Sequence, residues 1–343
     1  MKYSIIILIF IIASCKCNDN NEMAFSFNKK DDKLVIAFGS CNNQRIQNPF
    51  WKQLTAQNPD IWIWGGDVIY SDTEDMKVLA DNYEIQKKDI DYQYFIKKTY
   101  VMGTWDDHDY GMNDGGNEYS KKKESQKLFL DFMQVLPEDS RRMQEGVYYS
   151  RDFKINSKWL KIICLDTRYF RSALTKDVSG KKRYLPNNAK EATLLGEEQW
   201  KWLQNELYTS KAQFNIIVSS IQVLSNQHGF ETWGNMPLEV EKLEMLIQKS
   251  KAKGVIILSG DRHISEFSLT HLGNESTPLL DFTSSGMTHS YTSFTSEQNP
   301  YRVGNVVKDK SYGLVKLNFK SNVAQCEIWG EKQILLENYQ INF

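Results

Sequence analysis

Short apolar runs recur along the chain from Leu34 onward, each bounded by glycine, proline or acidic residues. The runs are rich in valine, isoleucine and tryptophan, a composition typical of β-strands. The strands expected from this pattern are 34–41, 60–67, 100–107, 146–153, 159–168, 214–224 and 255–263, and the part after Pro278 is mostly β, with 315–319 and 324–329 as its clearest runs.

Between these runs, apolar residues recur every three or four positions, which predicts amphipathic helices. In one such segment Leu128, Phe132 and Leu136 fall on a single helical face. The expected helices are 48–59, 120–136, 196–207 and 237–254. Strands flanked by helices predict an α/β fold whose sheets are covered on their outer faces. No linker rich in proline, glycine or serine interrupts residues 34–343, so we expect one domain there.

Residues 1–15 have the pattern of an export signal. A lysine precedes an apolar run that is too short to span a membrane comfortably. The sequence IASC at its end resembles a bacterial lipobox, which makes Cys15 the expected lipidation site. We therefore expect export, with the polar stretch 16–33 as a tether to the periplasmic or surface side of a bacterial membrane. An ordinary signal peptide and an uncleaved anchor are the alternatives.

The composition of the 343-residue chain predicts a globular protein with a substantial core. The net charge is −1, and 25% of the residues are charged, so neither disorder nor a basic nucleic-acid-binding stripe is expected. Cys41, Cys164 and Cys326 are scattered beside apolar residues and do not suggest a disulfide framework.

Polar motifs stand where four of the expected strands end: GSC, GGD, WDDHD and SGDRH. The carboxyl ends of strands are where α/β folds place their ligands. If the strands are neighbours, a thiol, a phenol, histidines and several acids converge: Cys41, Asp67, Tyr70, Asp106, Asp107, His108, Asp109, Asp261 and His263. Carboxylate and imidazole groups bind divalent or trivalent metals, and one bridging acid can serve two of them.

Each of these residues alone has an ordinary structural interpretation. Asp109 suits a helix N-cap and His263 a core histidine, while Tyr70 and Cys41 suit a packed core. Four such clusters, each at the end of an expected strand, nevertheless favour a metal site.

The ordered motifs GSC, GDVIY, TWDDHDYG, LDTRYFRS, SS-x-Q and SGDRH resemble those of the alkaline phosphatase D (PhoD-like) family of metallophosphoesterases. The resemblance covers about residues 34–290. It implies a four-layer αββα sandwich, in which two mixed β-sheets are flanked by helices. Larger family members carry an extra β-rich N-terminal domain and a twin-arginine signal, and this sequence shows neither feature.

The resemblance also implies a metal centre with two kinds of pocket. Cys41, Tyr70 and His263, together with Asp67, would form a soft anionic pocket suited to Fe³⁺. Asp67, Asp107 and Asp261 would form an oxygen pocket suited to Ca²⁺. The residue types alone also permit Zn²⁺ or Mn²⁺.

Four further residues receive catalytic roles from the resemblance. His108 would donate a proton or a hydrogen bond to the leaving-group oxygen, with Asp109 orienting its ring. A third metal ligand is the alternative for His108. Arg168 and Arg171 would bind the phosphate, because guanidinium groups match its oxygens bidentately. A structural salt bridge is the alternative for each arginine.

Three residues remain open at this point. Asn113 is a tentative oxygen ligand, beside Asp114, which either adds an oxygen or holds the loop. Gln222 and His228 follow the expected strand 214–224, where the wider group of metallophosphoesterases places a metal-binding histidine. We keep Gln222 as a tentative ligand.

These expectations combine into one functional hypothesis. The protein would be an exported, lipid-anchored, monomeric phosphoesterase that hydrolyses phosphate mono- or diesters by attack of a metal-bound hydroxide. A small molecule, a phospholipid headgroup or a polymer would supply the ester. The alternative is a catalytically degenerate surface lipoprotein that binds phosphate or phosphorylated glycans without turnover.

Overall fold

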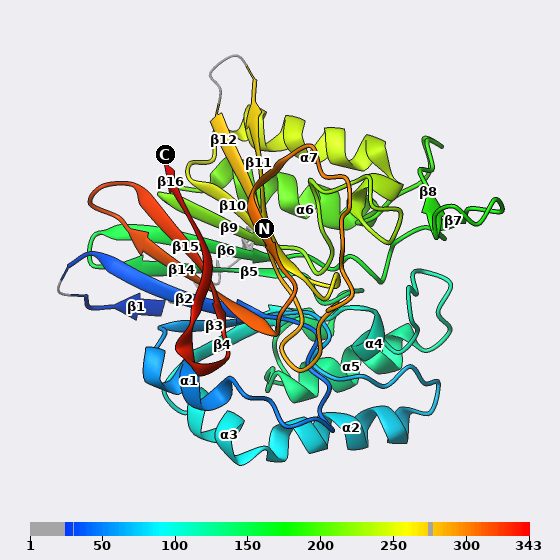
Figure 1. Cartoon of the computed structure of the whole chain (residues 1–343), viewed down its shortest axis with the longest axis horizontal. Coiled ribbons are helices and arrows are strands. Elements are labelled where there is room, and N and C mark those ends of the chain that lie inside the picture. The colour runs from blue at the N-terminus through cyan, green and yellow to red at the C-terminus, as the bar shows by residue number, and fades with distance from the viewer. Residues whose placement is uncertain (1–24, 30, 274–276) are drawn as a thin grey trace, which may run out of the picture.

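Two mixed β-sheets form the centre of the molecule (Figure 1). The computed structural model describes residues 25–29, 31–273 and 277–343. Sheet A has, in spatial order, β1 (Phe25–Phe27), β5 (Tyr149–Ile155), β6 (Lys158–Cys164), β9 (Phe214–Val218), β10 (Val255–Ser259), β12 (Thr277–Ser284), β11 (Ser265–Leu272) and β13 (Arg302–Val307). Sheet B has β16 (Leu335–Asn342), β15 (Val323–Gly330), β14 (Ser311–Asn318), β2 (Lys33–Gly39), β3 (Ile61–Gly65) and β4 (Tyr100–Thr104).

Helices cover the outer face of each sheet, which gives four layers (Figure 1). Sheet B is covered by α1 (Trp51–Gln57), α2 (Met76–Lys88), α3 (Ile90–Ile96) and α5 (Lys122–Phe132). Sheet A is covered by α6 (Gly196–Thr209) and α7 (Pro237–Ser250). The shorter elements are α4 (Asp107–Tyr110), η1 (Ser140–Arg142), β7 (Thr175–Lys176), β8 (Tyr184–Leu185), η2 (Trp233–Asn235) and η3 (Glu331–Gln333). The expected αββα sandwich is confirmed.

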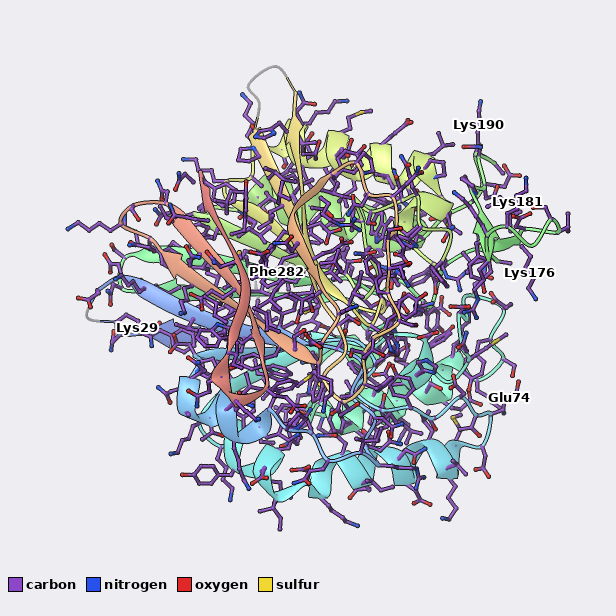
Figure 2. The ribbon with its side chains drawn as sticks, in the orientation of Figure 1. Lys29, Glu74, Lys176, Lys181, Lys190 and Phe282 are labelled. Carbon is purple, nitrogen blue, oxygen red and sulfur yellow. The ribbon has the colours of Figure 1, made fainter. Side chains whose placement is uncertain are left out.

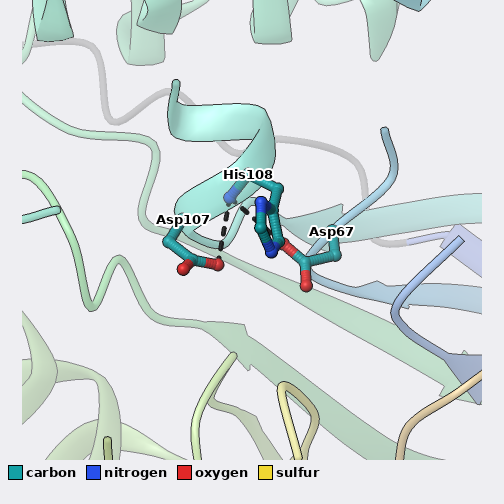
Figure 3. Close-up of side chains that lie close together, drawn as sticks. All are labelled: Asp67, Asp107 and His108. Atoms are coloured by element: carbon teal, nitrogen blue, oxygen red, sulfur yellow. Dashed lines mark hydrogen bonds between the residues drawn. The ribbon is translucent and has the colours of Figure 1, made fainter. Parts of the chain in front are cut away.

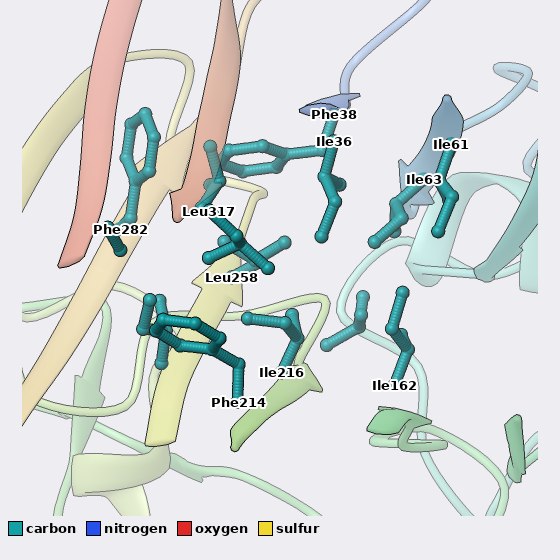
Figure 4. Close-up of a cluster of buried hydrophobic side chains, with 14 of the residues drawn as sticks. Ile36, Phe38, Ile61, Ile63, Ile162, Phe214, Ile216, Leu258, Phe282 and Leu317 are labelled. Atoms are coloured by element: carbon teal, nitrogen blue, oxygen red, sulfur yellow. The ribbon is translucent and has the colours of Figure 1, made fainter. Parts of the chain in front are cut away.

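The strands are apolar on both faces because each sheet packs against two layers. Successive side chains of a strand point to opposite faces. In β3, Ile61 and Ile63 enter the core between the sheets, whereas Trp62 and Trp64 pack under the helices. Figure 4 shows this inter-sheet core, in which strands of both sheets contribute.

The C-terminal strands complete sheet B. Strand β14 pairs antiparallel with β2 and is followed outward by β15 and β16. Most elements were predicted from the sequence, but α2, α3 and β11 were not.

The boundary expected for the tether is partly wrong. Residues 25–27, placed in the tether 16–33, form β1 and pair in parallel with β5 at the edge of sheet A. The leader 1–15, Cys15 and most of the tether lie outside the described residues. Within the described part of the chain, no helix has the length and apolarity needed to cross a bilayer.

Candidate active site

The motifs at the strand ends meet at one edge of the sandwich. Strands β2, β3 and β4 are parallel, so their carboxyl ends point the same way. The carboxyl end of β10, from sheet A, meets them there, because Cys41 Sγ lies 3.6 Å from the carbonyl oxygen of Asp261. The structure thus brings the following predicted residues together: Cys41, Asp67, Tyr70, Asp107, His108, Asp261 and His263.

Four of these residues have left-handed backbone conformations. The φ angles are 57° at Cys41, 49° at Asp67, 67° at Asp261 and 55° at His263. Residues other than glycine rarely adopt this conformation, which costs about 1–2 kcal/mol each. Such strain gathers at functional sites, where the surrounding structure holds it in place.

A thiol, a carboxylate, a phenol and an imidazole form one side of the site. Cys41 Sγ and the Tyr70 hydroxyl each lie 3.3 Å from Asp67 Oδ2. The Tyr70 hydroxyl also lies 3.2 Å from His263 Nε2. These are the four residues that the sequence analysis assigned to the soft pocket, and we call them the thiol–phenol side.

Carboxylates form the other side. Oxygen atoms of Asp106, Asp107 and Asp261 all lie within 4.8 Å of one another. Asp107 also forms such a group with Asp67 and His108, and the backbone N–H of His108 donates to Asp107 Oδ1 at 3.0 Å (Figure 3). Asp107 therefore stands at the centre of what we call the carboxylate side.

Two acids that the sequence analysis did not assign as ligands join the carboxylate side. Asp107, Asp114 and Glu231 form a third close group. The backbone N–H of Asp114 donates to Asp107 Oδ2 at 2.6 Å, so Asp114 also holds the loop. Glu231 lies in an irregular loop without any motif that could have marked it.

Burial and like charges shift the pKa values of several donors in the chain by itself. Burial and the neighbouring Cys41 raise the pKa of Asp67, and burial and Asp106 raise the pKa of Asp261. Burial raises the pKa of the Cys41 thiol to about 11 and that of the Tyr70 phenol above its usual value. A bound cation reverses such shifts, because it stabilises the charged form of each donor. The donor set therefore fits cations on both sides of the site.

Arg168 and Arg171 are buried and already paired with acids. The Arg168 guanidinium contacts Asp106 and lies 2.6 Å from Glu231. Arg171 Nε lies 3.0 Å from Glu231. Both side chains therefore form the structural salt bridges that the sequence analysis had left open.

The arginines place positive charge behind Asp107. Arg168 lies 4.0 Å from Asp107 Oδ1. Burial acts to raise the pKa of Asp107, but Arg168 and His108 hold it at about 2. The pKa of Asp107 is therefore lowered, whereas those of Asp67 and Asp261 are raised.

Asp72 and Tyr70 hold the ring of His108. His108 Nδ1 lies 2.6 Å from Asp72 Oδ2, and the ring packs 4.0 Å from the Tyr70 ring, measured between centroids. Among the described residues, His108 Nε2 has no hydrogen-bond partner. Burial acts to lower the pKa of His108, but the carboxylates of Asp67 and Asp72 raise it to about 11. The ring thus has one fixed nitrogen and one free nitrogen.

The prediction that Asp109 orients the His108 ring is wrong. The Asp109 carboxylate accepts hydrogen bonds from the backbone N–H groups of Asp106, at 2.6 Å, and Val68, at 3.1 Å. It thereby completes a capping box at the start of α4. Consecutive residues of a helix do not face each other, so Asp109 cannot hold the ring beside it. Asp72 was missed because it resembles an ordinary loop acid.

The three residues left open are Gln222, Asn113 and His228, and His228 Nδ1 accepts a hydrogen bond from the backbone N–H of Phe230 at 3.1 Å. The Gln222 amide donates to Glu266 at 2.8 Å and to Thr283 at 2.9 Å. Asn113 is exposed in the loop after α4, whereas its neighbour Asp114 reaches the carboxylate side. Among the described residues, neither Gln222 nor Asn113 has a hydrogen bond to an acid of the metal cluster.

The facing mixed sheets, the outer helices and the acids at the strand ends together define the metallophosphoesterase class of fold. Comparison with known families gives the finer assignment, since the model of the PhoD-like phosphatase family matches residues 36–338. The chain belongs to the PhoD-like phosphatase family, as its motifs indicated.

A curated relative is alkaline phosphatase D from Bacillus subtilis (strain 168). It is 26% identical over 214 residues, which cover 57% of this chain and 36% of that protein. The chain therefore matches only about a third of the length of this relative.

Solved structures share the fold. The structure of PhoD has a TM-score of 0.71 at 18% identity, covering 93% of this chain and 70% of that one. GAP50, the anchor in the inner membrane complex of Plasmodium, has a TM-score of 0.55 at 11% identity, covering 91% and 89%. A dimetal phosphatase from Danio rerio has a TM-score of 0.53 at 11% identity, covering 90% and 99%.

Proposed function

We propose that the protein is a metal-dependent phosphoesterase that hydrolyses phosphate mono- or diesters. One observation carries this proposal: the strand ends of both sheets bring a thiol, a phenol, a histidine and several carboxylates into one cluster, in a chain of the PhoD-like phosphatase family. A phosphate ester is accordingly the expected substrate.

The two sides of the cluster suit different cations. We assign Fe³⁺ to the thiol–phenol side, because thiolate, phenolate and imidazole are softer donors than carboxylate. We assign Ca²⁺ to the carboxylate side, where all donors are hard oxygens. Asp67 belongs to both sides and would be shared. When bound, such cations neutralise charge on the phosphoryl oxygens and acidify water.

His108 would serve the leaving group. Its Nδ1 is held by Asp72, so a proton on Nε2 is free to reach the oxygen that departs when the bond to phosphorus breaks. Arg168 and Arg171 would act indirectly. They are buried in ion pairs, so they would fix Asp106 and Glu231, and Arg168 would keep the pKa of Asp107 low, without binding the phosphate directly.

The test is turnover by the purified protein with its metal content measured in the same preparation. p-Nitrophenyl phosphate and bis(p-nitrophenyl) phosphate report monoester and diester hydrolysis. We expect turnover that a chelator abolishes and that His108→Ala lowers by about 100-fold or more. His271→Ala, which replaces an exposed histidine on β11, is the control. A protein that binds metals and phosphate without turnover is instead the catalytically degenerate binding protein.

We also propose that the protein is exported and anchored through a lipid on Cys15. The support is the leader sequence, which ends in the lipobox-like IASC. Fractionation of cells that express the full chain tests this. Wild-type protein should partition with membranes and Cys15→Ser should not. If wild type and Cys15→Ser partitioned equally with membranes, the lipid on Cys15 would not be the anchor, and an uncleaved apolar leader would explain the membrane association.

A further inference from the structure

A small hairpin, formed by β7 and β8, projects from the molecule (Figure 1). Strands β7 and β8 pair only with each other, and most of the surrounding side chains are exposed. Between residues 175 and 190, one acid, Asp177, stands among these cations: Lys176, Lys181, Lys182, Arg183 and Lys190. We call this segment the basic hairpin.

The basic hairpin is held in a defined position. The Asp177 carboxylate accepts hydrogen bonds from the backbone N–H groups of Ser179, at 2.8 Å, and Lys182, at 3.0 Å, which fixes its turn. The backbone N–H groups of Arg183 and Tyr184 both donate to the carbonyl of Gly229 at 3.0 Å. An isolated two-stranded hairpin is marginal by itself, so these contacts keep it ordered.

Two side chains connect the basic hairpin to the carboxylate side. The Tyr184 hydroxyl donates to Asp114 Oδ2 at 2.6 Å, and Arg183 forms an ion pair with the same carboxylate. Asp114 in turn donates its backbone N–H to Asp107. One residue therefore separates the basic hairpin from the central acid of the site.

The lysines of the basic hairpin lack ion-pair partners among the described residues. Figure 2 shows Lys176, Lys181 and Lys190 together at the end of the molecule, pointing outward. Some exposed lysines elsewhere pair with acids, as Lys201 does with Glu197 at 2.7 Å, so within the described part of the chain the basic hairpin is distinguished by the gathering of several unpaired lysines in one segment. Unpaired like charges repel one another, and a multivalent anion removes that repulsion.

We propose that the basic hairpin is a docking site for the part of a substrate that carries negative charges beyond the reacting phosphoester. This inference rests on the proposed function, since it extends the site from one phosphate to several anionic groups. A membrane surface fits less well. The tip exposes a single apolar residue, Val178, and interfacial segments need an apolar face as well as lysines.

Competition during turnover tests the docking site. Long-chain inorganic polyphosphate and orthophosphate are compared as inhibitors of p-nitrophenyl phosphate hydrolysis. The hairpin variant carries Lys176→Glu, Lys181→Glu and Lys190→Glu. The control variant carries Lys211→Glu, Lys253→Glu and Lys320→Glu. These three exposed lysines lie at the ends of β9, β10 and β14 that are remote from the active site.

We expect the inhibition constant of polyphosphate to rise about tenfold or more in the hairpin variant, because several exposed ion contacts that are each weak are lost at once. In the wild type the same constant should rise with salt concentration, because salt screens these contacts. The inhibition constant of orthophosphate should change by less than about twofold in the hairpin variant. The control variant should change neither. Equal changes for both inhibitors, or equal effects of both variants, would overturn the proposal.

Direct binding separates this proposal from the proposed function. Fluorescence anisotropy of labelled polyphosphate measures docking without turnover. A wild-type protein that does not hydrolyse esters but binds polyphosphate through the hairpin lysines would contradict the proposed function and support the docking site. Binding to phosphatidylglycerol vesicles that depends on these lysines, without polyphosphate binding, would identify a membrane contact instead.

Discussion

The two sides of the active-site cluster differ in the source of their positive charge. On the carboxylate side, Arg168 pairs with Asp106 and Glu231, Arg171 pairs with Glu231, and Arg168 helps to lower the pKa of Asp107. On the thiol–phenol side, Asp67 is contacted by the Cys41 thiol and the Tyr70 hydroxyl, and among the described residues no arginine or lysine forms an ion pair with it. The fold therefore neutralises part of the site by itself and leaves the rest to added cations.

This difference separates structural acids from ligands. An acid that is paired with a buried arginine has an internal counterion, and removal of either partner leaves an uncompensated charge. An acid without such a partner opposes folding until a cation binds. The following substitutions test this division, from the largest expected effect to the smallest.

Asp67 should show the largest effect, because both sides share it. Asp67→Asn keeps the shape and removes the charge. We expect kcat/KM for p-nitrophenyl phosphate to fall by about 1000-fold or more, because bound cations supply several kcal/mol of transition-state stabilisation. Elemental analysis of the same preparation should show lost metal. If the variant kept its full metal content and full activity, Asp67 would not be a metal ligand.

The same substitution gives a second readout. In chelated protein, Asp67→Asn should raise the urea midpoint, because burial and the neighbouring Cys41 disfavour the charged Asp67 carboxylate more than the nearby His108 stabilises it. A lower midpoint would mean that the thiol–phenol side has an internal counterion, and the contrast between the two sides would fail.

Arg168→Met should have the opposite effect on stability. It leaves Asp106 buried without its cation and leaves Glu231 with Arg171 alone, which typically costs about 3–5 kcal/mol. Urea denaturation of the chelated protein measures the loss. Arg45→Met, at an exposed arginine, is the control and should cost less than about 1 kcal/mol. A small loss at Arg168 would show that the ion pair is dispensable.

Asp72 and Asp109 should separate catalysis from capping. Asp72→Asn should lower kcat by about 10- to 100-fold with little change in KM, as expected for a residue that orients a catalytic group. Asp109→Ala should instead destabilise the fold by about 0.5–2 kcal/mol through the lost capping box. Steady-state kinetics and denaturation of both variants measure the difference. The reverse pattern would restore Asp109 as the residue that orients His108.

His228 should show the smallest effect, through pH. Burial, Arg262 and Lys182 lower its pKa from 6.5 to about 3, so the folded protein does not take up the proton that the unfolded chain binds below pH 6.5. His228 therefore reduces stability as the pH falls from 6.5 toward 3, by about 1.4 kcal/mol at pH 5.5.

His228→Asn should remove that part of the acid sensitivity. Urea midpoints at pH 7.5 and pH 5.5 measure it, with the exposed His271→Asn as control. An unchanged pH dependence would show that the cations around His228 do not keep it neutral.

The sequence predicted the donors at strand ends but not their partners. Cys41, Asp67 and His263 were found because each follows an apolar strand, and parallel strands end at one edge. Asp72 and Glu231 follow no strand and lie in irregular loops, so only the folded chain brings them to His108 and Arg168. Asp109 was assigned a wrong partner because sequence adjacency to His108 outweighed its position on a short helix.

Strand β1 has a consequence for solubility. Phe25 lies 4.6 Å from Tyr100 of sheet B, between ring centroids, while β1 pairs with β5 of sheet A. Residues 25–27 therefore lie across the gap between the two sheets at one open side of the sandwich. A version of the protein that begins at β2 would leave β5 with unpaired backbone groups next to uncovered aromatic rings, a surface prone to edge-to-edge aggregation. Residues 25–27 thus protect the folded domain from self-association.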